Sequence, residues 1–146
     1  MTMKPIDILV VEDNDDDVVL IQEAFAEGKM VNRIAVVRDG EEAMAYLHRQ
    51  GPYAAAPPPG MVLLDINMPK KNGFEVLTEI KTDARLRPLP VVMLTVSDRE
   101  EDVVRSFDQG ACSYIRKPVT LTRFVAVVKE FELYWSLVSR IPPLNR

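Results

Sequence analysis

Hydrophobic residues along this chain gather in short solid runs that alternate with longer amphipathic stretches. Runs of four consecutive apolar residues occupy positions 8–11, 61–64 and 91–94. Such runs are typical of strands that are buried on both faces, as in a parallel sheet covered by helices. The pattern predicts five strands, over residues 6–11, 34–37, 61–65, 91–95 and 113–116. The last run is the least apolar, which predicts an edge strand.

Apolar positions between these runs recur at helical spacing and predict five helices. The helices are expected to begin near Asp15, after Asp39-Gly40, near Asn72, after Ser97-Asp98 and after Thr120. Val19 in the first helix and Phe107 in the fourth are expected among the residues that face the core. Typical helix stops follow the first, second and fourth helices, at Gly28, Gly51-Pro52 and Gly110.

Strand and helix alternate five times, which favours an α/β fold. With right-handed crossovers, we expect a doubly wound five-stranded parallel sheet, flavodoxin-like, with strand order 2-1-3-4-5. A chain of 146 residues is long enough for one domain with a substantial core. We expect a single domain over residues 1–146, with its core over about 6–138 and a short proline-containing C-terminal tail.

Composition removes several classes of function. The formal net charge of −4 gives no basic footprint for nucleic acid. The apolar runs are too short to span a bilayer, and no signal peptide is expected before the first strand. Cys112 is the only cysteine, so no disulfide can form within the chain, and a cytoplasmic location is expected. Its position just before the fifth strand predicts a small buried residue.

Polar side chains lie at the carboxyl ends of four predicted strands. Glu12 and Asp13 follow the first strand, Asp65 ends the third, Thr95 ends the fourth and Lys117 follows the fifth. In the predicted order these ends meet at one edge, and the first and third strands flank the crevice. Three carboxylates, a hydroxyl and an ammonium are therefore expected together. The neighbouring acidic run, 14–17, is interpreted as a helix N-terminus and not as further metal ligands.

Three close carboxylates repel one another. At an effective dielectric constant of about 20, two unit charges roughly 4 Å apart interact by about 4 kcal/mol. A raised pKa or a bound cation relieves this repulsion, and oxygen-only ligand sets suit Mg²⁺ or Mn²⁺. His48, the only histidine, is expected on the second helix, away from this edge, so no zinc or Ser-His-Asp site is predicted. The sequence also contains no phosphate-binding loop of the nucleotide-binding proteins.

This combination resembles the receiver domain of two-component response regulators, of the CheY-like type. The matching residues are Glu12-Asp13, Asp65-x-x-Met68-Pro69-x-x-x-Gly73, Thr95, Tyr114 and Lys117-Pro118. The stretches 37–43 and 131–135 are similar to those of the stand-alone response regulators that partner bacterial phytochromes.

The resemblance implies a role for each matching residue. Asp65 accepts a phosphoryl group from a phosphohistidine on a sensor histidine kinase. Asp13, Asp65 and the backbone carbonyl of Asn67 hold Mg²⁺ (or Mn²⁺), and Glu12 acts mainly through water. Lys117 pairs with a phosphoryl oxygen, and Thr95 donates its hydroxyl to another. The switch residues are Thr95 and Tyr114: Tyr114 turns inward, which changes the surface around the fourth helix and fifth strand. The Lys117-Pro118 bond is expected to be cis.

The function implied is that of a switch protein and not of an enzyme. We expect a stand-alone receiver that a phytochrome-type histidine kinase phosphorylates. The alternative is a pseudo-receiver scaffold that dimerises without phosphorylation. A phosphatase of the haloacid dehalogenase type would need an acid where this chain has Asn67.

The last predicted helix is apolar over a wide arc. Leu121, Phe124 and Val125 belong to a face that is expected in the core. Residues expected at an interface with a partner are Val127, Phe131, Tyr134 and Val138. An edge helix this apolar is expected to be covered by a partner, and a two-fold homodimer is the commonest solution. The alternative is a long helix whose aromatic end folds against its own chain.

The segment from Pro52 to Gly60 is a proline-stiffened connection between the second helix and the third strand. It is longer than the usual loop between a helix and a strand. A surface loop and a docking loop for a partner are both compatible with it.

Overall fold

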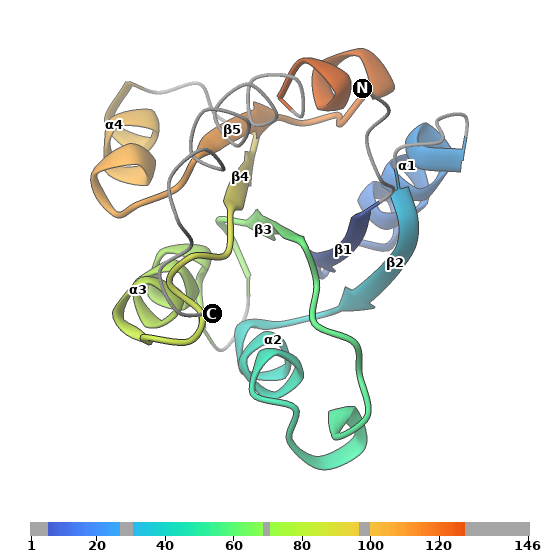
Figure 1. Cartoon of the computed structure of the whole chain (residues 1–146). Helices are drawn as coiled ribbons and strands as arrows, with labels where there is room; N and C mark the ends of the chain where they lie inside the picture. The colour runs from blue at the N-terminus through green and yellow to red at the C-terminus, as the bar shows by residue number, and fades with distance from the viewer. Residues whose placement is uncertain (1–5, 27–30, 69–70, 97–99, 128–146) are drawn as a thin grey trace, which may run out of the picture.

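The computed structural model describes residues 6–26, 31–68, 71–96 and 100–127, and the structural statements below concern this part of the chain (Figure 1). Within it, the strands form one parallel sheet in the order β2-β1-β3-β4-β5. The strands are β1 (Ile6–Val11), β2 (Val31–Val37), β3 (Met61–Asp65), β4 (Val91–Thr95) and β5 (Ser113–Arg116). The doubly wound, flavodoxin-like fold and its strand order are confirmed, although β2 begins three residues earlier than predicted.

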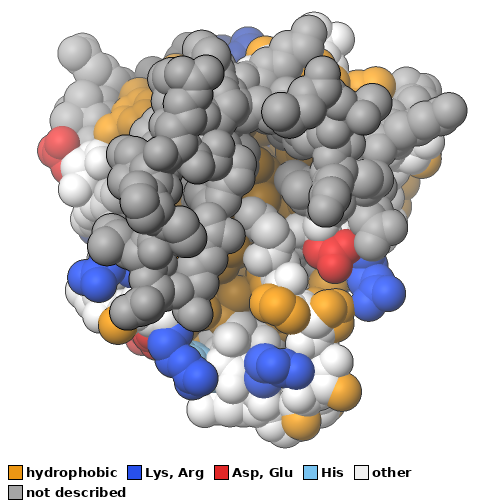
Figure 2. Space-filling model, viewed as in Figure 1, with side chains coloured by type: hydrophobic (Ala, Val, Ile, Leu, Met, Phe, Trp, Pro, Cys, Tyr) orange, Lys and Arg blue, Asp and Glu red, His pale blue; other side chains and the backbone are white. Residues whose placement is uncertain are grey.

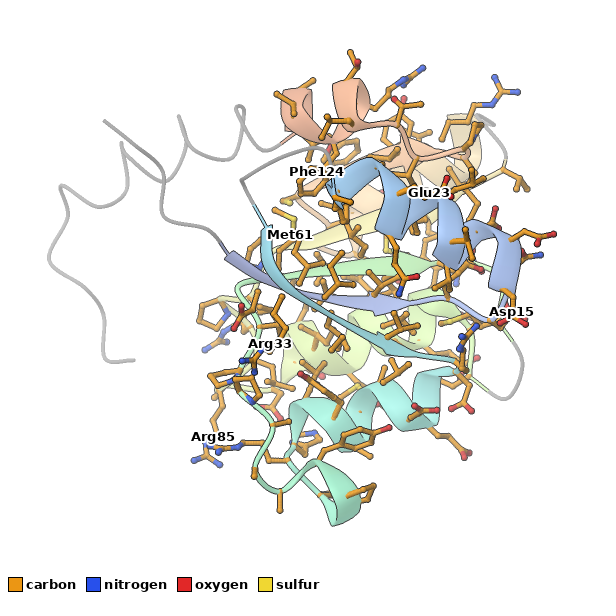
Figure 3. All side chains as sticks on the ribbon, turned by 90° about the vertical axis from the view of Figure 1, so that its right-hand side faces the viewer. Asp15, Glu23, Arg33, Met61, Arg85 and Phe124 are labelled. Carbon is orange, nitrogen blue, oxygen red and sulfur yellow. The ribbon has the colours of Figure 1, made fainter. Side chains whose placement is uncertain are left out.

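Helices cover both faces of this sheet. They are α1 (Asp15–Ala26), α2 (Gly40–Leu47), α3 (Gly73–Thr82) and α4 (Glu100–Asp108), with a short 3-10 turn η1 (Gly51–Tyr53), and residues 121–127 are also helical. α1 and the 121–127 helix share one face, where the Phe25 and Phe124 rings lie 4.2 Å apart, and α2 and α3 cover the other (Figure 3). No helix in the described ranges has the length and apolarity needed to cross a bilayer.

Side-chain caps fix where two of these helices begin. Asp39 Oδ1 accepts a hydrogen bond from Glu42 N at 2.8 Å at the start of α2. Asn72 Oδ1 accepts one from Glu75 N at 3.0 Å at the start of α3. Gly110 follows α4 with a φ of +99°, a left-handed conformation that favours glycine. These boundaries agree with the predicted ones.

Three side chains face differently from the prediction. α1 buries Ile21 and Phe25, four residues apart, and Val19 falls off this stripe and is 49 % exposed. Phe107 of α4, predicted in the core, is 47 % exposed. Cys112 is exposed as well, because it precedes an edge strand that has a neighbour on one side only.

The 121–127 helix also turns a different face to the core. Phe124 and Val127, three residues apart, are 0 % and 8 % exposed and belong to the core cluster on the α1 side. The prediction that Val127 faces a partner is therefore wrong, because this position packs inside the domain. Leu121 and Val125, predicted in the core, are only half-buried. The other predicted interface residues, Phe131, Tyr134 and Val138, lie outside the described residues.

The proline-rich segment between α2 and β3 is held against α2. The Tyr53 hydroxyl donates to Glu42 Oε1 at 2.7 Å, and the rings of Tyr46 and Tyr53 lie 5.1 Å apart. The Tyr46 hydroxyl donates a longer hydrogen bond, of 3.5 Å, to the Pro57 carbonyl. These contacts favour the surface-loop interpretation, and a docking role stays a prediction.

Candidate functional site

Asp65 is placed by a strand that is buried along its whole length. All of β3 is buried, and Asp65 pairs in register with Leu94 of β4. The Ile66 N–H donates to the Leu94 carbonyl at 3.0 Å, so the chain stays bonded to the sheet just beyond Asp65. The Asp65 carboxylate therefore stands at the carboxyl edge of the sheet with only 4 % of the residue exposed.

Gly73 fixes the loop that follows Asp65. The first residue of α3 returns to the strand end, where the Gly73 N–H donates to the Ile66 carbonyl at 2.9 Å. A Cβ at position 73 would collide with the Asp65 carbonyl oxygen and would lie 2.8 Å from Ile66 Cα. Only glycine permits this approach without a shift of the backbone. The last residue of the sequence motif thus supports the backbone beneath the Asp65 side chain.

Three carboxylates converge at this edge, as predicted. One oxygen each of Glu12, Asp13 and Asp65 lies within 4.8 Å of the others. Glu12 and Asp65 are buried whereas Asp13 is exposed, so the cluster opens to solvent on one side. The backbone N–H of Asn67 donates to Asp65 Oδ1 at 3.3 Å, which adds a donor at the same carboxylate.

The Lys117 ammonium stands among these carboxylates. Its Nζ lies 2.6 Å from Glu12 Oε2, 3.0 Å from Asp17 Oδ2 and 3.3 Å from Asp65 Oδ1. Only 9 % of the Lys117 side chain is exposed. Its backbone is fixed to the next strand, because the Lys117 N–H donates to the Thr95 carbonyl at 2.7 Å. A strongly held positive charge therefore faces Asp65.

Burial makes the ionised forms of these groups costly. It raises the pKa of Glu12 to about 7, and the Asp65 charge adds to this rise while Lys117 opposes it. Burial also raises the pKa of Asp65, again against the attraction of Lys117. Burial lowers the pKa of Lys117, but its ion pairs with Glu12 and Asp65 and its hydrogen bond to Asp17 outweigh this, so its pKa is raised overall. The edge thus carries one firm positive charge and a surplus of carboxylate that a further cation would relieve.

The donor set fits a small divalent cation. All the candidate ligand atoms are carboxylate oxygens, which suit Mg²⁺ and Mn²⁺. The buried Glu12 Oε2 lies within ion-pair distance of Lys117 Nζ. Among the described residues, however, no donor has the geometry of a hydrogen bond to this oxygen. The short separation marks an ion pair, and the oxygen keeps acceptor capacity for a cation or its water.

Thr95 and Tyr114 lie on the β4–β5 side of the cluster. Thr95, at the end of β4, is 3 % exposed. Tyr114 is half-buried, and its ring meets the Phe107 ring of α4 edge-on, with centroids 6.1 Å apart. The Lys117-Pro118 peptide that follows β5 is cis, as predicted. Both predicted switch residues therefore stand on the expected elements.

Asp17 is the site residue that the sequence interpretation missed. The acidic run predicts only a helix start, and the Asp17 N–H does donate to Asn14 Oδ1 at 3.0 Å in such a cap. Its carboxylate also reaches Lys117, 100 positions along the chain. Its position in the sequence could have indicated this contact. Asp17 follows Asp13 by four residues, and the first turn of a helix that begins at the crevice lies near the carboxyl edge of the sheet.

Charged side chains lie at both ends of the sheet. Figure 3 places Asp15 at the carboxyl ends of the strands and Arg33 and Arg85 at the opposite end. Figure 2 views the molecule from the amino ends, and its described surface shows several Lys and Arg side chains and few acidic ones. The carboxylate cluster of Glu12, Asp13 and Asp65 lies at the opposite end, which this view does not show.

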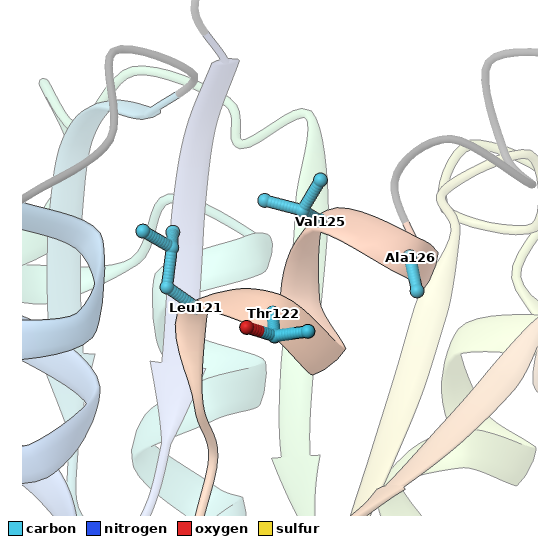
Figure 4. A pocket seen from close by; sticks show the side chains of 4 residues that line it. All are labelled: Leu121, Thr122, Val125 and Ala126. Atoms are coloured by element: carbon cyan, nitrogen blue, oxygen red, sulfur yellow. The ribbon is translucent and has the colours of Figure 1, made fainter.

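A pocket of about 430 Å³ lies elsewhere, on the 121–127 helix (Figure 4). The described residues that line it are Leu121, Thr122, Val125 and Ala126. None of these side chains is charged, and none belongs to the carboxylate cluster.

Comparisons with known proteins agree with this site. A family model for the response regulator receiver domain matches residues 8–129. Response regulator Rcp1 of Synechocystis sp. is 39 % identical over 135 residues, which cover 92 % of this chain and 92 % of Rcp1. A solved structure of Mn²⁺-bound Rcp1 is 38 % identical, covers 97 % of this chain and 100 % of its own, and superposes with a TM-score of 0.75.

Two further solved structures are similar over most of their length. The phosphorylated cyanobacterial phytochrome response regulator RcpA is 45 % identical, with 90 % of this chain and 94 % of RcpA covered and a TM-score of 0.76. The bacteriophytochrome response regulator RtBRR is 39 % identical, with 98 % of this chain and 84 % of RtBRR covered and a TM-score of 0.81. The family match contains every site residue described above, from Glu12 to Lys117. The chain therefore belongs to the family of response regulator receiver domains, which are signalling proteins, and within it resembles the phytochrome response regulators.

Proposed function

We propose that this protein is a stand-alone response regulator in which Asp65 accepts a phosphoryl group from a sensor histidine kinase. The observation that carries this proposal is the meeting of three carboxylates within 4.8 Å, with the Lys117 ammonium 3.3 Å from Asp65. Such an edge can neutralise a transferring phosphoryl group from two directions. The relative RcpA has been solved in a phosphorylated form and Rcp1 with Mn²⁺, which supports both parts.

Asp65 is the nucleophile in this proposal. One of its carboxylate oxygens forms the new bond to phosphorus while the bond from phosphorus to the imidazole nitrogen of the donor breaks, and that nitrogen keeps the electron pair. Mg²⁺ held by Asp13, Asp65 and the Asn67 carbonyl, with Glu12 acting through water, would neutralise charge on the transferring oxygens. Lys117 pairs with one phosphoryl oxygen as a point charge.

Thr95 and Tyr114 carry the response in this proposal. The Thr95 hydroxyl donates to a phosphoryl oxygen, and Tyr114 moves into the space that Thr95 leaves. The edge contact between Tyr114 and Phe107 is then lost, which changes the surface that α4 and β5 present. A difference of a few kcal/mol between the two arrangements is enough to shift the population.

The kinase in this proposal is of the phytochrome type. RcpA and RtBRR are named as response regulators of phytochromes, and their similarity extends over most of this chain. A phytochrome-type kinase labelled from radioactive ATP should pass its label to this protein faster than an unrelated histidine kinase does. Equal transfer from both kinases would contradict the proposed pairing.

Phosphorylation itself can be tested with a small donor. After incubation with Mg²⁺ and acetyl phosphate, a phosphate-affinity gel should show a shifted band for the natural protein and none for Asp65→Asn. Asp16→Asn is the matched control, because Asp16 is an exposed acid on α1 and the same charge is removed. If neither acetyl phosphate nor a kinase produces a band, the protein is a scaffold that works without phosphorylation.

We also propose a two-fold homodimer through the end of the last helix, with Phe131, Tyr134 and Val138 at the contact. The apolar sequence beyond residue 127 supports this, now without Val127. Tyr134→Glu combined with Val138→Glu should turn a dimer into a monomer in light scattering while circular dichroism stays unchanged. A monomeric natural protein would contradict the dimer.

A further inference from the structure

The Lys117 ammonium has as many carboxylate partners as it has N–H donors. Glu12 Oε2, Asp17 Oδ2 and Asp65 Oδ1 lie at 2.6, 3.0 and 3.3 Å from Nζ. Glu12 and Asp65 also belong to the cluster of carboxylates that could hold a metal ion, and Asp17 is not a member of that cluster. Asp17 is therefore the partner that belongs neither to the candidate metal site nor to the proposed phosphoryl acceptor.

Asp17 is itself held in position by its neighbours. Its N–H donates to Asn14 Oδ1 at 3.0 Å, and the Asn14 N–H donates to Glu12 Oε1 at 3.2 Å. This short run of chain sets two acceptors, from the end of β1 and the first turn of α1, on one ammonium. The Asp17 side chain is 26 % exposed against 9 % for Lys117, so Asp17 closes the solvent side of the ion pair.

We propose that Asp17 is a positioning residue that keeps the Lys117 ammonium aimed at Asp65 during phosphorylation, an inference that rests on the proposed phosphoryl transfer. When Asp65 carries a phosphoryl group, the contact of 3.3 Å from Nζ to Asp65 Oδ1, the longest of the three, is exchanged for one to a phosphoryl oxygen. Asp17 continues to occupy one N–H and thereby fixes the direction of the other two. An ammonium without this anchor samples more positions and meets the phosphoryl oxygen less often.

Asp17→Ala is expected to slow phosphorylation by acetyl phosphate at saturating Mg²⁺ by about three- to tenfold, which corresponds to roughly 0.6 to 1.4 kcal/mol. The concentration of Mg²⁺ that gives half the maximal rate should not change, because Asp17 is outside the carboxylate cluster. Asp16→Ala, on the same turn of α1, should match the natural protein. Asp17→Asn retains an oxygen acceptor and should restore part of the rate.

The decisive comparison is made in a Lys117→Met background. If Asp17 acts through Lys117, Asp17→Ala causes no further loss of rate there. The natural protein, the two single variants and the double variant form a double-mutant cycle. Their free energies of unfolding in urea, measured without metal or phosphate donor, should show a coupling between positions 17 and 117. That measurement reports the ion pair independently of phosphorylation.

Each result decides between the claims. Equal losses from Asp17→Ala with and without Lys117 would assign Asp17 a purely structural part and overturn the inference. Phosphorylation of Asp17→Ala at the natural rate would also overturn it while leaving the proposed function intact. If the natural protein is not phosphorylated at all, the proposed function fails and the positioning claim fails with it.

Discussion

The centre and the edge of the sheet both serve the site, but they are built differently. β3 is buried at every position, and backbone contacts from β4 and α3 hold the chain around Asp65. At the edge, β5 buries only Ile115, and Tyr114 meets the half-exposed Phe107. The proposed nucleophile is thus fixed, whereas the residue proposed to respond to it lies half-buried on an edge strand.

This difference suits a protein whose chemistry must stay constant while its surface changes. Close-packed interior side chains have a single good arrangement, and a void or an added atom among them is costly. A half-buried aromatic pair at an edge strand can change its arrangement at a smaller cost than side chains in the core can. Stability should therefore reside at the centre of the sheet and responsiveness at its edge.

The largest effect is expected from a cavity at the centre. Leu64 on β3 is 0 % exposed, and Leu64→Ala should lower the free energy of unfolding by about 3 to 4 kcal/mol through lost burial and an unfilled void. Urea unfolding measures this loss. Val19→Ala, at a position that is 49 % exposed on α1, is the control and should cost less than about 0.5 kcal/mol. Similar losses at both positions would remove the contrast.

The next largest effect concerns the loop behind Asp65. Gly73→Ala places a Cβ against the Asp65 carbonyl oxygen and 2.8 Å from Ile66 Cα, so the backbone must shift, at a cost of about 2 to 3 kcal/mol. Gly51→Ala is the control, because it introduces backbone strain without a steric clash. Gly51 has a φ of +55° with open space around it, and its substitution should cost about 1 kcal/mol. A loss at Gly73 no larger than at Gly51 would argue against the tight support of Asp65.

A smaller effect, a gain in the free energy of unfolding, is expected from substitution of Glu12. Burial raises the pKa of Glu12 from 4.5 to about 7, so between these values the folded protein binds more protons than the unfolded chain. The free energy of unfolding therefore falls as the pH rises through this window in the absence of metal. Glu12→Gln removes this contribution and should gain about 1 to 2 kcal/mol at pH 7.5, while the contribution of Asp65 remains.

Urea unfolding of both proteins at pH 4.5 and pH 7.5 measures the difference at Glu12. Added Mg²⁺ should stabilise the natural protein more than the variant, because binding to the folded state adds to its stability. Identical pH profiles for the two proteins would show that Glu12 is not strained by burial.

The smallest effect is expected at the edge. Phe107→Ala should cost less than about 1 kcal/mol, because its ring is already 47 % exposed. The NMR signals of the Tyr114 ring should nevertheless shift, since the edge contact at 6.1 Å is lost. Phe74→Ala is the contrasting variant, because Phe74 is 5 % exposed beneath Arg105, and it should cost about 3 kcal/mol. Unchanged Tyr114 signals would show that the two rings are independent.

The sequence could predict the sheet because its three central strands, β1, β3 and β4, are almost purely apolar. A run that is apolar throughout, such as β3, must be buried on both faces of the sheet. The polar residues that end such parallel strands then meet at one edge. The helices offer a choice, because they carry more apolar residues than the buried stripe can hold. Val19, Phe107 and Val127 were each assigned to the wrong side for this reason. Asp17 was missed because a helix N-terminus explains an acidic residue without any partner.

Asp17 and Lys117 are 100 positions apart in the sequence, which has a consequence during synthesis of the protein. During synthesis the acids that follow β1, those of the first turn of α1 and Asp65 of β3 leave the ribosome well before Lys117. A truncated product therefore carries the repelling anions without their counterion. Only a chain translated beyond its fifth strand contains the whole of the proposed acceptor site, so we expect copies that terminate earlier not to be phosphorylated.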